Sequence, residues 1–283
     1  MFVIIGGFVV LGSVIGGYLM AKGHMAILFQ PSEFIIIGGA ALGSFIISSP
    51  PRILKQILGK IGMVFKGKTP NKEFYLNLLT LLYDIFALMR KEGILAIEKD
   101  LVAPENSQIF QKYPDILHHH HIVDFIVDNL KIVVSIPVQP YELDSLMEID
   151  IDATHTDEHA AAHNLNLVAE SFPGLGIVAA VLGVVITMGS INEPPEVLGH
   201  HIGAALIGTF IGILLCYGFI GPFSTNLAHL LRLEGIALNA IKNAIVSYMR
   251  TTSPQMSVEF GRRAIPAVDR PTFDELEKAL KKK

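Results

Sequence analysis

The chain has 283 residues, of which 51% are hydrophobic and only 17% are charged, and its formal net charge is −4 at pH 7. This composition is too apolar and too poor in charge for an ordinary soluble enzyme, so a lipid bilayer is the expected solvent for part of the chain. The single cysteine, Cys216, has no partner for a disulfide and is therefore not informative about the redox compartment.

Four stretches of the chain contain no Lys, Arg, Asp or Glu, and the remainder holds all of these residues. The stretches are Phe2–Ala21, Phe34–Ser49, Phe172–Ile191 and Ile202–Gly221. A helix of about 20 residues covers about 30 Å, the thickness of the hydrocarbon core, whereas the shorter second stretch covers only about 24 Å. Buried core helices are the alternative, but they are usually shorter and carry a polar face. We therefore predict four transmembrane helices.

The distribution of basic residues predicts the orientation of these helices. Of the 22 Lys and Arg residues, only Lys22 falls between the first two stretches, and none falls between the last two. Basic residues mark the cytoplasmic side, so both short connections are predicted outside and both chain ends in the cytoplasm. The absence of Lys and Arg from residues 132–231 weakens this prediction. The first stretch lacks the basic start of a signal peptide, which favours an uncleaved anchor.

The rest of the chain has the helical patterns of a cytoplasmic domain. From Glu73 to Leu101, apolar residues recur at helical spacing, which predicts one long amphipathic helix, eased at Gly93. Further helices are predicted from Ile122 to Ser135, from Pro140 towards the membrane, and from Leu227 to Arg250. The fold class is an all-α membrane protein with four transmembrane helices and a large helical cytoplasmic domain. Its expected parts are two transmembrane helices, a cytoplasmic helical domain, two channel-lining transmembrane helices and a cytoplasmic tail, at residues 1–49, 50–171, 172–221 and 222–283.

Small residues four positions apart occur in every apolar stretch. They are Gly12 and Gly16, Gly39 and Gly43, Ala179 and Gly183, and Gly208 and Gly212. Such pairs let helix backbones approach closely in lipid, although glycine is also simply common in membrane helices. We expect tight packing or oligomerisation of the helices.

Small, weakly polar residues also share one face of each of the last two helices. They are Pro173, Ala180 and Thr187 on the third helix, and Ala205, Thr209, Gly212 and Cys216 on the fourth. Together these faces are predicted to line a narrow path for an ion or its water. The alternative for Thr187 and Thr209 is a hydroxyl group bonded to its own helix backbone.

No carboxylate falls within any of the four stretches, although an ion path through lipid generally needs an ionisable relay. Either nothing ionic passes, or a partner supplies the carboxylate. Pro173 and Pro222 bracket the last two stretches at their cytoplasmic ends. Proline at these positions frees backbone carbonyl groups and predicts a hinge or a helix terminus.

Several segments resemble one known family. They are residues 172–185, residues 208–215 followed by 217–220 and Pro222, residues 37–40, and residues 258–263 with 270–271. These segments resemble the MotA family of flagellar stator subunits, within the MotA, TolQ and ExbB proton channel superfamily, and the match runs nearly end to end. The related ExbB and TolQ proteins carry three spans, so the four predicted here favour MotA.

The resemblance implies a pentamer of this chain around two copies of MotB in the bacterial inner membrane, with the titrating aspartate on MotB's single transmembrane helix. By position it implies that Thr209 lies beside the ion path, which we predict to include Ala180 and Thr187. It also implies that Pro173 and Pro222 couple protonation to movement of the cytoplasmic domain. Glu170 falls where the family has aspartate, so it joins this coupling set. Sodium-driven relatives have threonine in place of Ala180, so the resemblance favours H⁺ over Na⁺, and no cofactor is expected.

The resemblance also places Arg90 and Glu98 at positions that form charge pairs with the rotor protein FliG. From the residues alone, the two lie a little over two helical turns apart and would project from one side of the predicted long helix. A charge on an exposed helix is usually only a solvated group. Opposite-charge contacts at a rim suit transient engagement of a partner.

Histidines form two clusters, His118–His121 and the trio His155, His159 and His163. Aligned imidazoles could bind a metal, but the trio lies on an alanine-rich polar face with no thiolate nearby, so we predict no metal site.

Other classes of function find little support. No nucleotide loop, nucleophile motif or metal motif is present, so we predict that the chain is not an enzyme, and no nucleic-acid partner is expected. A solute transporter would need broken helices or inverted repeats, and neither is found. The remaining alternatives are an ExbB-like or TolQ-like energiser of a periplasm-spanning partner and a non-conducting membrane scaffold.

Overall fold

The computed structural model describes residues 2–66 and 70–281, and these residues form helices and no strand. The longer helices are α1 (Phe2–Met20), α3 (Pro31–Ser48), α4 (Pro51–Lys66), α5 (Lys72–Glu92), α8 (His120–Ser135), α9 (Pro140–Gly189), α10 (Pro195–Leu214), α11 (Gly221–Thr251), α12 (Pro254–Ala264) and α13 (Phe273–Lys281). The short elements are α2 (Met25–Leu28), η1 (Ile94–Ile97), α6 (Glu98–Val102), η2 (Pro104–Asn106), η3 (Phe110–Lys112), α7 (Pro114–Leu117) and the π-helical segment η4 (Leu215–Ile220). The predicted all-α fold class is confirmed.

The helices form two compact units. The described residues within Met1–Lys68 and Asp157–Leu230 make the first, which we call the membrane unit. Those within Thr69–Thr156 and Leu231–Lys283 make the second, which we call the core unit. The long helices α9 and α11 each contribute residues to both units.

Within the described part of the chain, four helical segments are long and apolar enough to cross a membrane, as predicted. They are Phe2–Met20, Met25–Ser48, Pro140–Gly189 and Pro195–Thr251. Many large apolar side chains on these segments are exposed. Helix α1 has no buried residue, and Phe8 and Val185 are examples of exposed apolar residues. Such a surface is expected where helices meet lipid or further subunits.

The second span differs from the prediction at its start. It comprises α2 and α3, and Pro31 takes the first position of α3, where its missing N–H is not needed. The span therefore includes Glu33, which lies on the buried face of α3 with Ile37 and Ala41. The predicted stretch begins one residue later, at Phe34, so the helical segment extends beyond it and takes in one carboxylate.

Residues after the second span form α4, which the sequence marked only as a basic stretch. Ile57 and Val64 are buried on one face, while Arg52 and Lys55 are exposed. Basic residues opposite an apolar face are typical of a helix that lies along a membrane surface.

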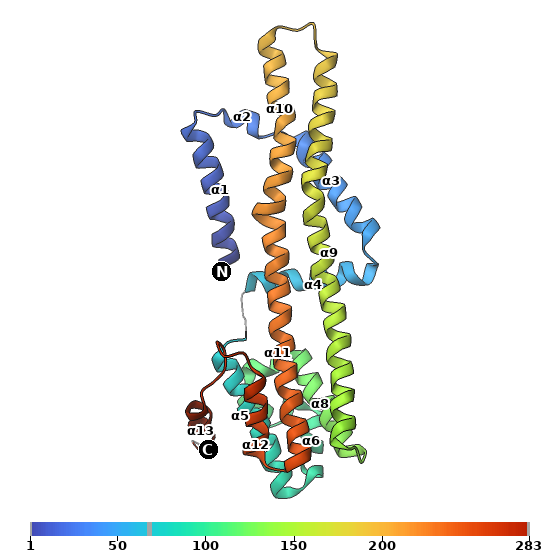
Figure 1. Cartoon of the computed structure of the whole chain (residues 1–283), viewed down its shortest axis with the longest axis vertical. Helices are drawn as coiled ribbons and strands as arrows, with labels where there is room; N and C mark the ends of the chain where they lie inside the picture. The colour runs from blue at the N-terminus through green and yellow to red at the C-terminus, as the bar shows by residue number, and fades with distance from the viewer. Residues whose placement is uncertain (1, 67–69, 282–283) are drawn as a thin grey trace. The chain divides into compact units, whose positions relative to one another are not determined.

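Helix α5 supplies many of the buried apolar side chains of the core unit and is labelled among its helices in Figure 1. Tyr75, Leu78 and Phe86 of this helix are fully buried, and α12 and α13 pack against it. The Phe86 ring stacks on that of Tyr248 from α11, with centroids 4.6 Å apart. The helices predicted from Ile122, Pro140 and Leu227 are confirmed as α8, α9 and α11.

The predicted single helix from Glu73 to Leu101 is interrupted at Gly93. Helix α5 ends at Glu92, and Gly93 has a φ of 94°, a conformation that glycine adopts without a steric cost. Its N–H donates to the Met89 carbonyl at 3.0 Å, which closes the helix. The chain continues as η1 and α6, so the prediction of one long helix is wrong.

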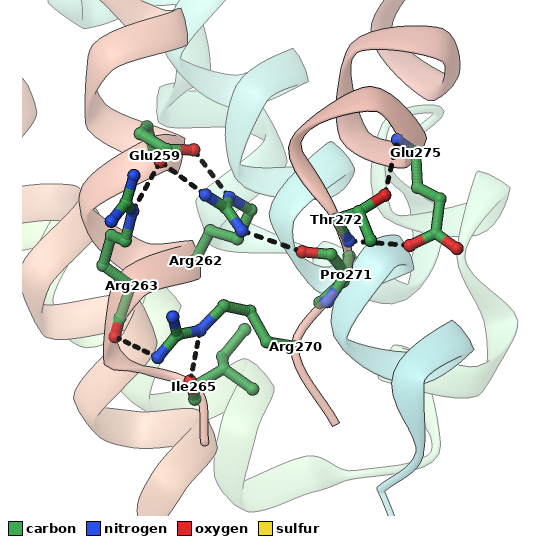
Figure 2. Close-up of polar contacts among 8 residues, drawn as sticks. All are labelled: Glu259, Arg262, Arg263, Ile265, Arg270, Pro271, Thr272 and Glu275. Carbon is green, nitrogen blue, oxygen red and sulfur yellow. Dashed lines mark hydrogen bonds and ion pairs between the residues drawn. The ribbon is translucent and has the colours of Figure 1, made fainter. Parts of the chain in front are cut away.

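Charged side chains hold the C-terminal segment of the core unit (Figure 2). Arg262 donates to both carboxylate oxygens of Glu259, each at 2.6 Å, and to the Pro271 carbonyl at 2.9 Å. Arg263 donates to Glu259 at 2.8 Å. The hydrogen bonds from Arg262, with those from Arg263, lower the pKa of Glu259 below its ordinary value although burial opposes this. The two arginines therefore keep this carboxylate ionised.

A second ion pair attaches α13 to α5. Lys72 donates to Glu275 at 2.7 Å, and the Thr272 N–H donates to the other carboxylate oxygen at 2.7 Å. The hydrogen bond from Lys72, followed by that from Thr272, lowers the pKa of Glu275 to about 2. Both charged side chains remain accessible to solvent, so the pair contributes little to stability.

Candidate functional site

Helices α9 and α10 run side by side and pack through small residues (Figure 1). A Cβ atom on Gly176 would lie 2.7 Å from the Gly208 carbonyl oxygen, and one on Gly183 would lie 2.7 Å from the Cβ of Ala205. Because these distances are shorter than normal contacts, any larger side chain would push the helices apart. The predicted close packing is confirmed in this hairpin, where the backbones themselves touch.

The other predicted glycine pairs make no such contact within this chain. A Cβ atom on Gly12, Gly16, Gly39 or Gly43 would meet nothing within 4 Å. Conversely, two residues of the predicted path face, Ala205 and Gly212, are occupied in packing against α9. The small-residue spacing thus identified packing in one hairpin, and two of the residues predicted to line the path take part in that packing.

The three predicted ion-path residues lie in different surroundings. Thr187 is buried and its hydroxyl donates to the Gly183 carbonyl at 2.8 Å, which is the alternative raised for it. Ala180 and Thr209 are both half-buried. The backbone nitrogen of Ala180 lies 3.2 Å from a Cβ position on Gly208, the neighbour of Thr209. The structure thus brings Ala180 and Thr209 to neighbouring turns, and their role in ion passage stays a prediction.

Neither predicted hinge proline ends its helix. Pro173 lies inside α9, and the chain passes from α10 through η4 into α11, in which Pro222 is the second residue. Proline has no N–H to donate, so each interrupts the hydrogen-bond ladder of a helix that nevertheless continues. The terminus interpretation is wrong for Pro173, whereas Pro222 lies in the first turn of α11, and the hinge interpretation stays a prediction for both.

The π-helical segment η4 lies directly before Pro222. The N–H of Gly221 donates to the Cys216 carbonyl, and a Cβ at Gly221 would lie 2.7 Å from that oxygen. Wide turns of this kind are common at functional sites, where a helix must change its path. Sequence reasoning missed this segment, because a π turn has no strong local pattern.

Glu170 and Pro222 line one cavity of about 530 Å³ in the membrane unit. The cavity also includes Cys216, Tyr217, Asn166, Asn226 and His229. The Asn166 side-chain amide donates to the Glu170 carboxylate at 2.6 Å. The structure therefore joins two residues of the predicted coupling set to η4, while Pro173 lies outside this lining. Asn166, Asn226 and His229 were not predicted, since isolated polar residues near a span end carry no sequence signal.

The predicted rotor-binding residues are both exposed, on either side of the break at Gly93. Arg90 is in the last turn of α5, and Glu98 is the first residue of α6. Their placement on one continuous helix face is therefore wrong. A cavity of about 570 Å³ in the same unit has a lining that includes Asp84, Lys91 and Lys99, of which the two lysines follow Arg90 and Glu98 directly in sequence.

Among the described residues, no group of three or more His, Cys, Asp or Glu side chains is arranged to hold a metal ion. His119 of the first histidine cluster lies edge-on to Phe74, with ring centroids 5.1 Å apart. In this position it serves the packing of the core unit.

Two protein-family models match the chain. The Motility protein A N-terminal model matches residues 4–93, and the MotA/TolQ/ExbB proton channel family model matches residues 119–234.

Curated relatives match over nearly the full length. The Motility protein A of Salmonella typhimurium is 38% identical over 99% of this chain and 95% of its own. The protein of the same name from Escherichia coli is 39% identical over the same shares of both chains. The Chemotaxis protein LafT of Vibrio parahaemolyticus is 36% identical over 98% of this chain and 97% of its own.

Solved structures share the fold. A structure of C. jejuni MotAB has a TM-score of 0.79 at 19% identity, covering 96% of this chain and 98% of that one. The flagellar MotAB stator complex from Bacillus subtilis has a TM-score of 0.78 at 20% identity, covering 97% and 100%. From the identity to its full-length relatives, the chain belongs to the Motility protein A family.

Proposed function

We propose that this chain, a flagellar stator subunit, forms with a single-helix partner of the MotB type a path along which protons cross the membrane and drive its cytoplasmic part. One observation carries the proposal: the α9–α10 hairpin has its two helix backbones in close contact, and residues 172–191 and 202–221 contain no charged residue. This hairpin belongs to a chain that is similar to Motility protein A over its whole length. An ion path in lipid needs an ionisable relay, so the partner supplies a carboxylate. The solved relatives are MotAB complexes, which supports MotB as that partner.

The ion path in this proposal runs beside Thr209, with Ala180 on the facing helix and Thr187 further along it. A charged carboxylate next to an apolar wall has a high free energy, and a proton that binds the partner's carboxylate removes this charge. Binding and release of the proton therefore change how the helices of the wall pack. The methyl group of Ala180 offers no oxygen ligand for Na⁺, which favours H⁺ as the driving ion.

The coupling step in this proposal uses Pro173, Pro222 and Glu170. Glu170 and Pro222 line a common cavity with η4, and both prolines weaken the ladder of a helix that continues beyond the span. A change of packing around the path can therefore bend α9 and α11, which reach from the membrane unit into the core unit.

Torque in this proposal is delivered through Arg90 and Glu98, which contact opposite charges on the rotor protein FliG. Both side chains are exposed, and charge pairs at an exposed rim set register and association rate more than affinity. This suits a contact that must form and break repeatedly.

The assembly we propose is a pentamer of this chain around two partner copies in the bacterial inner membrane, in contact with lipid and with both chain ends in the cytoplasm. The exposed apolar surfaces of α1, α3 and α10 and the absence of Lys and Arg between α9 and α10 support this placement. Full-length relatives are motility proteins, so an ExbB-like energiser and a scaffold are not favoured.

Proton uptake into vesicles that contain the chain and its partner tests the path. Thr209→Val keeps the shape of the side chain and removes its hydroxyl, so it should lower proton flux, whereas Thr251→Val in the core unit should not. Equal flux in all three proteins would overturn the proposed path.

Swimming speed and rotor docking test the coupling and the rotor contact. Arg90→Glu should weaken motility while the protein still accumulates in the membrane. Pro173→Ala should slow rotation without abolishing docking to the rotor. Unchanged torque in Pro173→Ala would remove that residue from the coupling step.

A further inference from the structure

Glu33 is a buried carboxyl group in the membrane unit that the proposed mechanism does not use. The residue is only 6% exposed to solvent, and its Oε2 atom has no hydrogen-bond partner among the described residues. It takes the first position of an otherwise apolar seam, followed at helical spacing by Ile37 and Ala41. Burial of a polar group in such a seam costs free energy unless the group is hydrogen-bonded, so its presence calls for a structural explanation.

The carboxyl group fits into a notch in the α9–α10 hairpin. A Cβ atom on Gly208 would lie 2.5 Å from Glu33 Oε2, 3.0 Å from the Cβ of Ala179 and 3.2 Å from the nitrogen of Ala180. Only glycine at position 208 leaves this space open. Glu33 thus lies directly behind the turn that carries Thr209 and opposite the turn that carries Ala180.

The helices that pack around Glu33 contain no Lys or Arg that could balance a charge on it. Residues 132–231, which include α10 and the membrane part of α9, contain no Lys or Arg. The titratable side chains nearest to Gly208 in sequence are His201 of α10 and Cys216 of η4, about two turns away in either direction, and α9 has none after Glu170. Neither α2 nor the rest of α3 carries any. The first turn of a helix favours a negative charge, but this effect is smaller than the cost of an unpaired buried ion.

We propose that Glu33 retains its proton and, as a neutral carboxyl group seated at Gly208, acts as a positioning residue that holds α3 against the α9–α10 wall behind Thr209 and Ala180. The inference rests on the proposed function, because the wall it positions is that of the proposed ion path. It adds a proton-bearing group that belongs to this chain rather than to the partner.

Proton flux through the chain reconstituted with its partner tests this role. Glu33→Gln keeps a neutral polar group of the same size and should retain flux within about twofold, whereas Glu33→Ala should lower it about tenfold or more, since small misplacements are costly. Glu196→Gln, at an exposed carboxylate in the first turn of α10, is the matched control and should have no effect. Loss of flux in Glu33→Gln, or full flux in Glu33→Ala, would overturn the proposal.

Two further measurements separate positioning from a general loss of folding. Gly208→Ala fills the notch and should lower flux, and the double variant with Glu33→Ala should conduct better than Gly208→Ala alone. The infrared difference between the wild-type complex and Glu33→Gln at neutral pH should show the C=O stretch of a protonated carboxyl group. Carboxylate bands in that difference, or strictly additive losses in the double variant, would contradict the inference.

The partner's carboxylate distinguishes this inference from the function on which it rests. Replacing that carboxylate by an amide should abolish flux. If it does so while Glu33→Ala conducts normally, only the role of Glu33 fails. If the amide variant conducts normally, the proposed function fails as well.

Discussion

The membrane unit and the core unit hold their helices together in different ways. In the core unit, large side chains such as Leu78 and Phe86 are fully buried between helices. In the membrane unit, Gly176 and Gly183 bring backbones into contact, and α1 buries no residue at all. Apolar side chains gain little by leaving lipid, so close backbone packing replaces the hydrophobic effect there. Substitution of a large side chain by a smaller one should therefore damage the core unit, whereas substitution of glycine by a larger residue should damage the membrane unit.

This difference also suits the proposed function. A core filled by interlocking side chains resists deformation, which suits a part that transmits force. The α9–α10 hairpin packs through small residues, and it is followed by the π-helical segment η4, with Pro173 inside α9 and Pro222 at the start of α11, so small shifts of these helices require little repacking.

The largest effect on stability is expected from Phe86→Ala in the core unit. The ring is fully buried and stacks on Tyr248, so its removal should lower the free energy of unfolding by about 3–5 kcal/mol. Thermal unfolding of the purified full chain measures this. Phe260→Ala removes a ring that is 51% exposed and is the matched control. Equal losses in the two variants would break the distinction between buried and exposed rings.

The reverse change, a gain of volume, should damage the membrane unit. Gly176→Val would place Cβ against the Gly208 carbonyl and should cost about 1–3 kcal/mol and abolish swimming. Gly174→Val is the control, because nothing lies within 4 Å of a Cβ at Gly174. Should both variants swim equally well, the close packing of α9 on α10 would not matter for function.

Acid should weaken the core unit through Glu259. Its pKa is lowered by Arg262 and Arg263, so its stabilising effect is fully present above the ordinary value of 4.5 and is lost as the pH falls through the lower, folded-state value. Glu259→Gln should cost about 2 kcal/mol at neutral pH and flatten this acid dependence. Unfolding temperatures between neutral and acidic pH measure it. The Glu277→Gln variant, at an exposed pair with Lys281, should keep the wild-type dependence.

The smallest effect is expected from Glu275→Gln. Its carboxylate is held by Lys72 and Thr272, which lower its pKa to about 2, but water screens the pair. The shift in unfolding temperature should be smaller than that of Glu259→Gln and should shrink further in high salt. A larger, salt-independent shift would show that exposed pairs contribute as much as the buried Arg262 pair.

Much of the fold could be predicted because the membrane imposes a simple rule. The absence of charge located the spans, and helical spacing located α8, α9 and α11. Boundaries were less predictable: Gly93 was recognised as a weak point, but the sequence does not show that its φ is positive and that α5 therefore ends there. Glu33 fell outside the predicted second span because the span was defined by the absence of charged residues.

The candidate site was less predictable than the spans, because it depends on how two helices are aligned. The spacing of small residues pointed to Ala179, Gly183, Gly208 and Gly212, but Gly176, which meets both Gly208 and Gly212, belonged to no predicted pair. Likewise, Glu170 and Pro222 are far apart in sequence and share a cavity only because α9 and α11 are neighbours, joined by a 2.9 Å hydrogen bond from Ser224 to the Ala162 carbonyl.

The proposed conducting path takes its wall from this chain and its main titrating group from a partner. Proton flux into vesicles should be measured for the purified chain alone and for the chain with its MotB-type partner, under the same imposed pH gradient. We predict flux only when the partner is present. Free passage of protons through the chain alone would contradict the account.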